Sequence, residues 1–229
     1  MTAPDSARAR PRGFRQARCG GCGLTQPACV CELWPALSSP LELSIVMSPS
    51  EARSASNTAR LLALWLPGTR LHVRGGQSEA ASPDASLSRP HSAVLFPGGT
   101  PEAELSAADW SSLEHLIVPD GTWSQARRIE RRCFAPEGLP RIELDPAWPS
   151  IYSLRRKSGG LCTFEAVAIA IALGQSPSLG RTLLERFSEW ARRAEWLKAG
   201  GTGKQGEVMP QKPREHPASA RLREREAAR

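Results

Sequence analysis

The stretch His115-Leu116-Ile117-Val118-Pro119-Asp120-Gly121-Thr122-Trp123 decides the fold class, because a mostly apolar run passes directly into a polar turn. Residues 115–118 have the length and composition of a buried β-strand. Gly121 permits the turn that follows, and the basic sequence beyond it predicts a helix over residues 124–133. A strand, a turn and a helix are therefore expected here, with Asp120 at the end of the strand.

A second stretch repeats this arrangement earlier in the chain. Residues 93–96 predict a buried strand, followed at once by Pro97-Gly98-Gly99-Thr100 and then by a helix over 106–113, with Ser106 as N-cap and Asp109 in the capping-box position. Alternating strands and helices predict an α/β domain with a mostly parallel sheet, in which ligands bind beyond the carboxyl ends of the strands. Strands or extended segments are also predicted at residues 41–47, 70–73, 140–144 and 151–154, and helices at 51–66, 163–173 (capped by Thr163) and 178–197.

Charge is concentrated at the two ends of the chain. Residues 1–18 carry five Arg and one Asp, and residues 192–229 carry ten Lys or Arg and five Glu, whereas the chain as a whole has a net charge of +7. Basic ends around a nearly neutral middle suit a polyanionic partner, although charge that serves only solubility fits equally well. We expect residues 1–18 to be a disordered basic arm and residues 200–229 a disordered basic tail.

The sequence contains neither an apolar run of about 18 residues, which a membrane-spanning helix needs, nor an apolar segment near Met1 typical of a secretory signal. A cytoplasmic protein without a membrane partner is therefore expected, and no obligate protein partner is evident. Sequences typical of dinucleotide-binding loops, phosphate-binding loops and zinc proteases are also absent.

Four of the six cysteines lie close together, as Cys19-x-x-Cys22 and Cys29-x-Cys31. Without a secretory signal, clustered thiols indicate a metal site rather than disulfides. Four thiolates suit tetrahedral Zn²⁺ with no open coordination position, which predicts a structural zinc knuckle over residues 19–35. A redox-active dithiol and an iron–sulfur cluster are the alternatives.

Asp120 has two interpretations from the residues alone. The commoner role of an Asp in this position is to shape the turn or to cap the following helix, and the other is catalysis at the strand end. The predicted helix that follows places Arg128, Arg131 and Arg132 on one face. Such a run is usually a solvated surface, but its position beside a strand-end site also suits nucleic acid.

The order of motifs resembles the DTW-domain family over residues 19–174. In chain order, the matching motifs are the Cys-x-x-Cys…Cys-x-Cys knuckle, Pro-x-Glu…Asn-Thr (Pro49, Glu51, Asn57, Thr58), the strand and Pro-Gly loop of residues 95–100, Asp-x-Thr-Trp (Asp120, Thr122, Trp123) and Tyr-x-Leu-Arg…Thr-x-Glu-Ala (Tyr152, Leu154, Arg155, Thr163, Glu165, Ala166). Cys162 stands where Ser is frequent in the family. Lys157 stands where family members often have an acidic residue after the Arg pair.

The resemblance implies a fold and a reaction that spacing alone does not. It implies that residues 36–199 form a SPOUT-like catalytic domain with a trefoil knot. It also implies transfer of the 3-amino-3-carboxypropyl group from S-adenosylmethionine to N3 of a uridine in tRNA, with release of methylthioadenosine. The alternatives are a SPOUT-like RNA methyltransferase and a zinc-knuckle RNA-binding module without activity.

The same resemblance, combined with the chemistry, suggests roles for particular residues. Asp120 is the expected general base for uridine N3, and Glu165 is the second choice. Trp123 is expected to pack against the cofactor or a base, unless it is a core residue. The residues expected to bind the cofactor are Leu95, Phe96, Pro97, Gly98, Gly99, Pro119, Thr122, Trp123, Leu161, Thr163 and Glu165, and those expected to bind RNA are Arg127, Arg128, Arg155 and Arg156.

Overall fold

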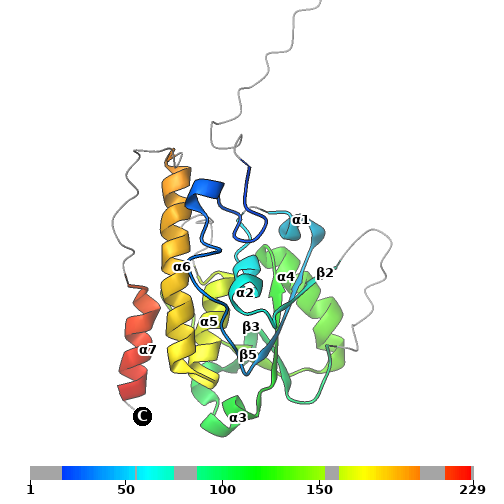
Figure 1. Ribbon diagram of the computed structural model, residues 1–229. Coiled ribbons are helices and arrows are strands. Elements are labelled where there is room, and N and C mark those ends of the chain that lie inside the picture. The colour runs from blue at the N-terminus through cyan, green and yellow to red at the C-terminus, as the bar shows by residue number, and fades with distance from the viewer. Residues whose placement is uncertain (1–16, 55, 75–86, 153–159, 202–214, 228–229) are drawn as a thin grey trace, which may run out of the picture.

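A computed structural model describes residues 17–54, 56–74, 87–152, 160–201 and 215–227 (Figure 1). Its strands form one parallel sheet in the order β2-β1-β4-β3-β5, which confirms the predicted α/β class. The strands are β1 (Glu42–Met47), β2 (Arg70–Val73), β3 (Ser92–Pro101), β4 (His115–Asp120) and β5 (Arg141–Glu143).

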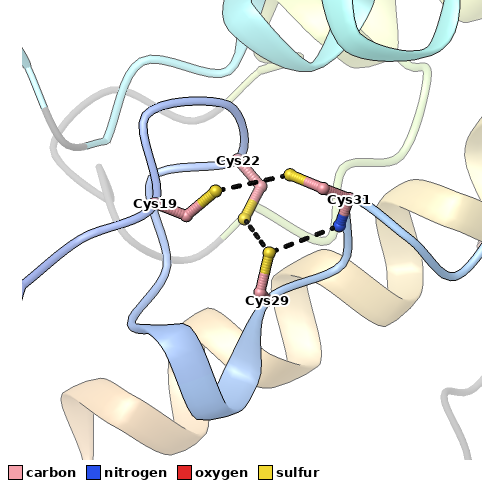
Figure 2. A group of neighbouring side chains, drawn as sticks. All are labelled: Cys19, Cys22, Cys29 and Cys31. Atoms are coloured by element: carbon pink, nitrogen blue, oxygen red, sulfur yellow. Dashed lines mark hydrogen bonds between the residues drawn. The ribbon is translucent and has the colours of Figure 1, made fainter.

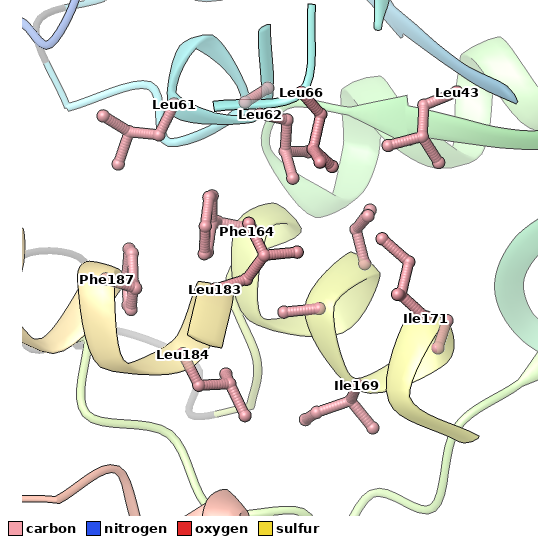
Figure 3. Close-up of a cluster of buried hydrophobic side chains, with 14 of the residues drawn as sticks. Leu43, Leu61, Leu62, Leu66, Phe164, Ile169, Ile171, Leu183, Leu184 and Phe187 are labelled. Atoms are coloured by element: carbon pink, nitrogen blue, oxygen red, sulfur yellow. The ribbon is translucent and has the colours of Figure 1, made fainter. Parts of the chain in front are cut away.

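Helices cover both faces of the sheet, so its central strands are buried on both sides. On one face, Leu43 and Leu116 belong to the same apolar core as Phe164 and Leu183, and Figure 3 shows part of this core between α2, α5 and α6. On the other face, Val46, Val94 and Ile117 pack with Ile129 and Phe134.

The helices are α1 (Pro49–Ala52), α2 (Ala59–Trp65), α3 (Ala107–Ser112), α4 (Trp123–Ile129), α5 (Thr163–Gly174), α6 (Pro177–Lys198) and α7 (Pro217–Ala227). A π-helical segment lies at Glu130–Phe134, and 3-10 turns lie at Gln26–Ala28, Glu102–Glu104 and Ala135–Glu137.

The register of the sheet brings the strand ends together. Met47 at the end of β1 pairs with Asp120 at the end of β4, and β3 lies on the other side of β4. Because all these strands are parallel, their carboxyl ends lie at one edge of the sheet, where ligands bind in open α/β sheets. The prediction that Asp120 stands at a strand end is confirmed.

Several predicted helices differ in detail from the observed ones. The helix expected over 51–66 is two short helices, α1 and α2, and the turn between them directs the Asn57 side chain inward to Asp120. The helix expected over 124–133 changes to π-helical geometry after Ile129. Thr163 does not cap α5, because Cys162 holds the N-cap position and the Thr163 hydroxyl is bonded to Asp120 instead.

The expectation of an unstructured tail from residue 200 is wrong for its last part. Helix α7 packs against α5 and α6 (Figure 1), with Ala218, Ser219 and Leu222 buried. A polar sequence forms an ordered helix here because its few small apolar residues share one face. Its arginines also find partners, and Arg225 pairs with Glu102.

Some predictions fall on residues 1–16, 153–159 and 202–214, which lie outside the described residues; these include most of the basic arm, Arg155 and Arg156. The trefoil knot likewise stays a prediction. Within the part of the chain that the structure describes, no helix has the length and apolar character needed to cross a membrane.

Candidate functional site at the carboxyl edge of the sheet

A cavity of about 880 Å³ opens at the carboxyl edge of the sheet, a size typical of small-molecule sites. It lies where the end of β4 meets the turn before α2, the outer part of β3 and the start of α5. The wall residues are Glu51, Ser56, Thr58, Leu95, Phe96, Pro97, Val118, Pro119, Gly121, Thr122, Trp123, Ala126, Ser150, Tyr152, Gly160, Leu161, Cys162, Thr163 and Ala166.

One wall of the cavity is a bulge in β3. Leu95 and Thr100 both pair with Ile142 of β5, so residues 96–99 loop out of the ladder toward the cavity. Gly98 has a φ of +82°, which favours glycine. At Gly99 a Cβ would lie 2.5 Å from the Arg141 backbone, and only glycine fits so close an approach. Both glycines therefore shape the wall without lining the cavity.

Asp120 lies beneath the cavity rather than in its wall and is 3% exposed. Thr163 Oγ1 donates to Oδ1 of Asp120 at 2.5 Å, and Asn57 Nδ2 donates to Oδ2 at 2.7 Å. The carboxylate does not cap α4, because Thr122 does so by accepting a hydrogen bond from the Gln125 N–H. The helix-cap interpretation of Asp120 is therefore wrong.

Asn57 joins two carboxylates at this floor. Its Oδ1 accepts from the Arg60 N–H, which turns its amide group so that Nδ2 faces both Asp120 and Glu51. Glu51 is buried, accepts from Asn57 Nδ2 at 3.2 Å and lines the cavity. Neither residue was a predicted site residue, although the Pro-x-Glu…Asn-Thr motif contains both.

Glu165 is completely buried and its carboxylate is already engaged by four donors. Ser150 Oγ and the Cys162 N–H donate to Oε2, while the Ile151 N–H and His216 Nε2 donate to Oε1. Burial raises the pKa of Glu165, but the hydrogen bonds from His216, Cys162 and Ser150 outweigh it and hold the pKa below its ordinary value. Neither carboxylate lines the cavity, but Asp120 is hydrogen-bonded to Thr163, which does, whereas Glu165 is enclosed by its four donors.

Trp123 marks the rim of the cavity and is 53% exposed, so the interpretation of this residue as part of the core is wrong. Its ring meets Phe96 edge to face at 6.2 Å. Trp123 also borders a second hollow of about 400 Å³, whose other wall residues are Ser124, Arg127, Arg128 and Arg131. We call this hollow the arginine groove. Arg132, expected on the same face, does not line it.

The arginine groove differs from the rest of the surface in its charge pairing. Most arginines elsewhere in the described ranges are paired with carboxylates or bonded to backbone carbonyls, as in Arg192 with Glu189 and Arg186 with the Pro35 carbonyl. Arg127, Arg128 and Arg131 are exposed, and no guanidinium of the three has a hydrogen bond or ion pair with another described residue. Three exposed cations without a carboxylate partner among the described residues, beside an exposed indole, are suited to an anionic, aromatic ligand.

The four clustered cysteines come together as expected (Figure 2). The Sγ atoms of Cys19, Cys22, Cys29 and Cys31 all lie within 4.8 Å of one another, close to the separation of about 3.8 Å expected around tetrahedral zinc with Zn–S bonds of about 2.3 Å. The backbone N–H of Cys22 lowers the pKa of Cys19 to about 7, whereas burial raises the pKa of Cys22. Four thiolates at this distance repel one another without a cation, so the cluster fits a metal ion.

Contacts with α6 fix the cluster to the domain. Trp190 Nε1 donates to the Cys22 carbonyl at 2.9 Å, and Arg193 Nη1 donates to the carbonyls of Ala28 and Cys29. The metal-binding segment therefore packs on the long helix α6.

Most of the predicted cofactor residues line the cavity, as Leu95, Phe96, Pro97, Pro119, Thr122, Trp123, Leu161 and Thr163 do. Gly98, Gly99 and Glu165 support it from behind. Sequence reasoning missed the wall carboxylate Glu51, which belongs to the same motif as Asn57, the floor amide Asn57 and the buried His216. Asn57 carried a motif signal, whereas His216 lies in a polar tail that gave none.

The fold and the site define an α/β protein with a strand-end cavity above a buried carboxylate and with a four-cysteine cluster. A model of the DTW domain matches residues 16–194, so the chain belongs to the DTW domain family. No solved structure matches the chain.

Curated relatives carry a common name. Proteins named tRNA-uridine aminocarboxypropyltransferase 2 from Macaca fascicularis and Mus musculus are each 28% identical over 175 residues, 69% of this chain. The matched region spans 57% of the length of those two relatives. The protein of the same name from Drosophila melanogaster is 30% identical over 184 residues, covering 74% of this chain and 72% of the relative.

Proposed function

We propose that this protein transfers the 3-amino-3-carboxypropyl group of S-adenosylmethionine to N3 of a uridine in tRNA. The observation that carries the proposal is the buried Asp120 carboxylate, held by Asn57 and Thr163 beneath a cavity of about 880 Å³. The name shared by the curated relatives supports the same reaction.

The cavity offers both kinds of surface that S-adenosylmethionine needs. Apolar side chains, including Leu95, Phe96 and Pro119, suit the adenine ring, and the backbone of residues 96–99 and 161–163 offers polar groups for the adenosine and methionine parts. Glu51, which lies in the wall, is a buried carboxylate that suits an ammonium or sulfonium group. The bound cofactor supplies an electrophilic γ-carbon next to a cationic sulfur.

In this mechanism Asp120 is the base that accepts the N3 proton of uridine. Thr163 lines the cavity and donates its hydroxyl proton to Asp120, so the proton of N3 passes to Asp120 through this hydroxyl. The nitrogen forms a bond to the γ-carbon with its own electron pair as the carbon–sulfur bond breaks. The electron pair of the broken carbon–sulfur bond stays on sulfur, which leaves in neutral methylthioadenosine. Asp120 then releases the proton to water.

The arginine groove provides the RNA side of the proposal. Arg127 and Arg128 bind phosphates flanking the target uridine, together with Arg131 and, from the undescribed segment, Arg155 and Arg156. Trp123 stands between groove and cavity, where its exposed ring stacks on a base rather than on the cofactor. A single-stranded loop of tRNA presents such a base without breaking a duplex.

The four-cysteine cluster holds structural Zn²⁺ in this proposal, with all four thiolates as ligands. The trefoil knot and SPOUT-like topology implied by the family belong to the same proposal. They agree with a parallel sheet whose ligand cavity is closed by the segments before and within α5.

The test uses S-adenosylmethionine labelled separately in the methyl group and in the carboxyl group, incubated with tRNA and the full chain. We expect the carboxyl label alone in tRNA. Asp120→Asn is expected to retain binding of tRNA and to lower transfer by at least about 100-fold, the lower end for a lost general base.

Each other outcome of this experiment contradicts part of the proposal. Methyl label in tRNA identifies a methyltransferase, and tRNA binding without any transfer identifies an inactive RNA-binding module. Transfer by Asp120→Asn at a near wild-type rate removes Asp120 from the mechanism.

A further inference from the structure

We propose that His216, from the C-terminal segment, is a positioning residue for the cavity wall, and that α7 is therefore part of the working site. Nothing in the reaction proposed above uses this histidine. The inference rests on the proposed function only in taking the cavity as the S-adenosylmethionine site.

The hydrogen bonds of His216 show which nitrogen of its imidazole ring carries the proton. Its side chain is 0% exposed. Nδ1 accepts a hydrogen bond from the Ala218 N–H at 3.1 Å, so the lone pair is on Nδ1 and the proton is on Nε2. Nε2 then donates to Oε1 of Glu165 at 3.0 Å. This pattern assigns the neutral Nε2–H tautomer, aimed at one buried carboxylate.

Glu165 in turn accepts hydrogen bonds from two separate segments of the cavity wall. Its carboxylate accepts from Ser150 Oγ at 2.7 Å and the Ile151 N–H at 2.9 Å on one side, and from the Cys162 N–H at 2.9 Å on the other. Ser150 and Cys162 both line the cavity. A single carboxylate thus joins the wall segments that precede and follow residues 153–159.

Without His216 this arrangement is incomplete. A carboxylate that is fully buried is stable only with enough donors, and removal of His216 leaves Oε1 with the Ile151 N–H alone. The two wall segments then lose the fixed ionised group that aligns them. A shift of about 1 Å in a binding wall is enough to weaken a precisely held ligand.

Helix α7 is held in place by contacts that do not involve His216. The guanidinium of Arg221 lies 4.3 Å from the centroid of the Trp148 ring, and Arg225 pairs with Glu102. Glu102 also accepts hydrogen bonds from Trp148 Nε1 at 2.8 and 2.9 Å. A substitution of His216 alone is therefore not expected to detach the helix.

The test compares His216→Asn with His216→Gln in the full chain. The Gln side chain places an amide nitrogen where Nε2 stands and keeps the donor to Glu165, whereas the shorter Asn keeps only the position of Nδ1. We expect His216→Asn to raise the Kd of S-adenosylmethionine and its KM by about 10-fold, the size of one lost charge-assisted hydrogen bond. The expected values for His216→Gln lie within about 3-fold of wild type.

Glu226→Gln is the matched control, because it removes the ion pair of α7 with Arg181 while leaving His216 in place. Its Kd and KM are expected to equal those of wild type. Equal Kd values for the Asn and Gln variants would overturn the inference. If His216 served stability alone, both substitutions would change the melting temperature, and the affinity for S-adenosylmethionine would not depend on which of the two is present.

Hydrogen exchange separates this inference from the proposed function. Peptides covering residues 148–152 and 160–163 are expected to exchange faster in His216→Asn than in His216→Gln, with or without a cofactor. If the wild type neither binds S-adenosylmethionine nor transfers from it, the proposed function fails, and the exchange result still decides the positioning role. Unchanged exchange in His216→Asn overturns it.

Discussion

At the scale of single residues, Asp120 shows what holds a buried carboxylate in place. Its two oxygens take hydrogen bonds from Asn57 and Thr163, which lie 63 and 43 positions away in the chain. The sequence places an Asp after a buried strand and before a Gly, and this is enough to single it out. Its partners follow only from the way the α1–α2 turn and α5 meet β4.

Thr163→Val tests the connection between Asp120 and the cavity. Valine keeps the branched shape and removes the hydroxyl that donates to Oδ1. We expect the rate of transfer to tRNA to fall by about 10-fold or more, because the proton path to the base is interrupted. The Kd of S-adenosylmethionine, measured by calorimetry, should change far less.

Thr163→Ser is the matched control, since it keeps the hydroxyl and loses only the methyl group. Its transfer rate should stay close to wild type. If the Val and Ser variants transfer equally fast, Asp120 accepts the proton without Thr163.

At the scale of elements, α4 carries the arginine groove, and its geometry departs from the sequence prediction. An uninterrupted α-helix puts Arg128, Arg131 and Arg132 on one face. The groove is instead lined by Ser124, Arg127, Arg128 and Arg131, whose spacing also corresponds to one face of a regular α-helix. Arg132 comes after the change to π-helical geometry at Glu130 and does not line the groove. The run of arginines is evident in the sequence, but which of them lie together beside Trp123 is seen only in the structure.

Trp123→Ala tests this element directly. We expect a single-stranded, uridine-containing oligonucleotide to bind about 5- to 150-fold more weakly, because one stacked base contributes about 1–3 kcal/mol. Trp123→Phe should retain most of the affinity, measured by fluorescence anisotropy. Unchanged RNA affinity together with a loss of S-adenosylmethionine binding would place Trp123 on the cofactor instead.

Two neighbouring arginines, Arg131 inside the arginine groove and Arg132 outside it, allow a matched test of whether the groove binds phosphates. Arg131→Gln, inside the groove, is expected to reduce the slope of log K against log salt by about 1. Arg132→Gln lies outside the groove and should leave the slope unchanged. Equal slopes for the two variants would mean that the groove does not grip phosphates.

At the scale of the whole molecule, the N- and C-terminal parts of the chain meet on the same helix. The cysteine cluster is bonded to α6 through Trp190 and Arg193, and α7 packs against α5 and α6. The cluster and the C-terminal helix thus brace α6 from separate sides (Figure 1).

Metal removal is therefore expected to weaken the whole fold. Chelation of the bound ion should lower the melting temperature by at least about 5 °C, because loss of metal-binding free energy is loss of folding free energy. Metal content by mass spectrometry and calorimetric melting check this. Cys22→Ser should melt lower than wild type and no longer respond to the chelator.

Cys133→Ser provides the control, since Cys133 is buried but lies outside the cluster. Its melting temperature should still fall on chelation. A wild-type protein that binds no metal, or whose melting is insensitive to chelation, contradicts a structural metal site.

The parallel α/β class, the strand end that carries Asp120 and the cysteine cluster were all predictable from the amino-acid sequence. All three depend on local signals: an apolar run, a glycine turn and short Cys spacing. The predicted helix bounds differ from the observed ones where tertiary contacts compete with local preference. Asn57 bonds to Asp120 instead of extending a helix, and Thr163 bonds to Asp120 instead of capping one.

The exposure of Trp123, the enclosure of Glu165 and the return of the polar segment 215–227 to the site could not be predicted from the sequence. The physical reason is the same in each case. The environment of a side chain depends on which distant segment packs against it, and a tail with little apolar surface is ordered only by partners such as Trp148 and Glu165. The order of α7 and the role inferred for His216 thus come from contacts that no local pattern contains.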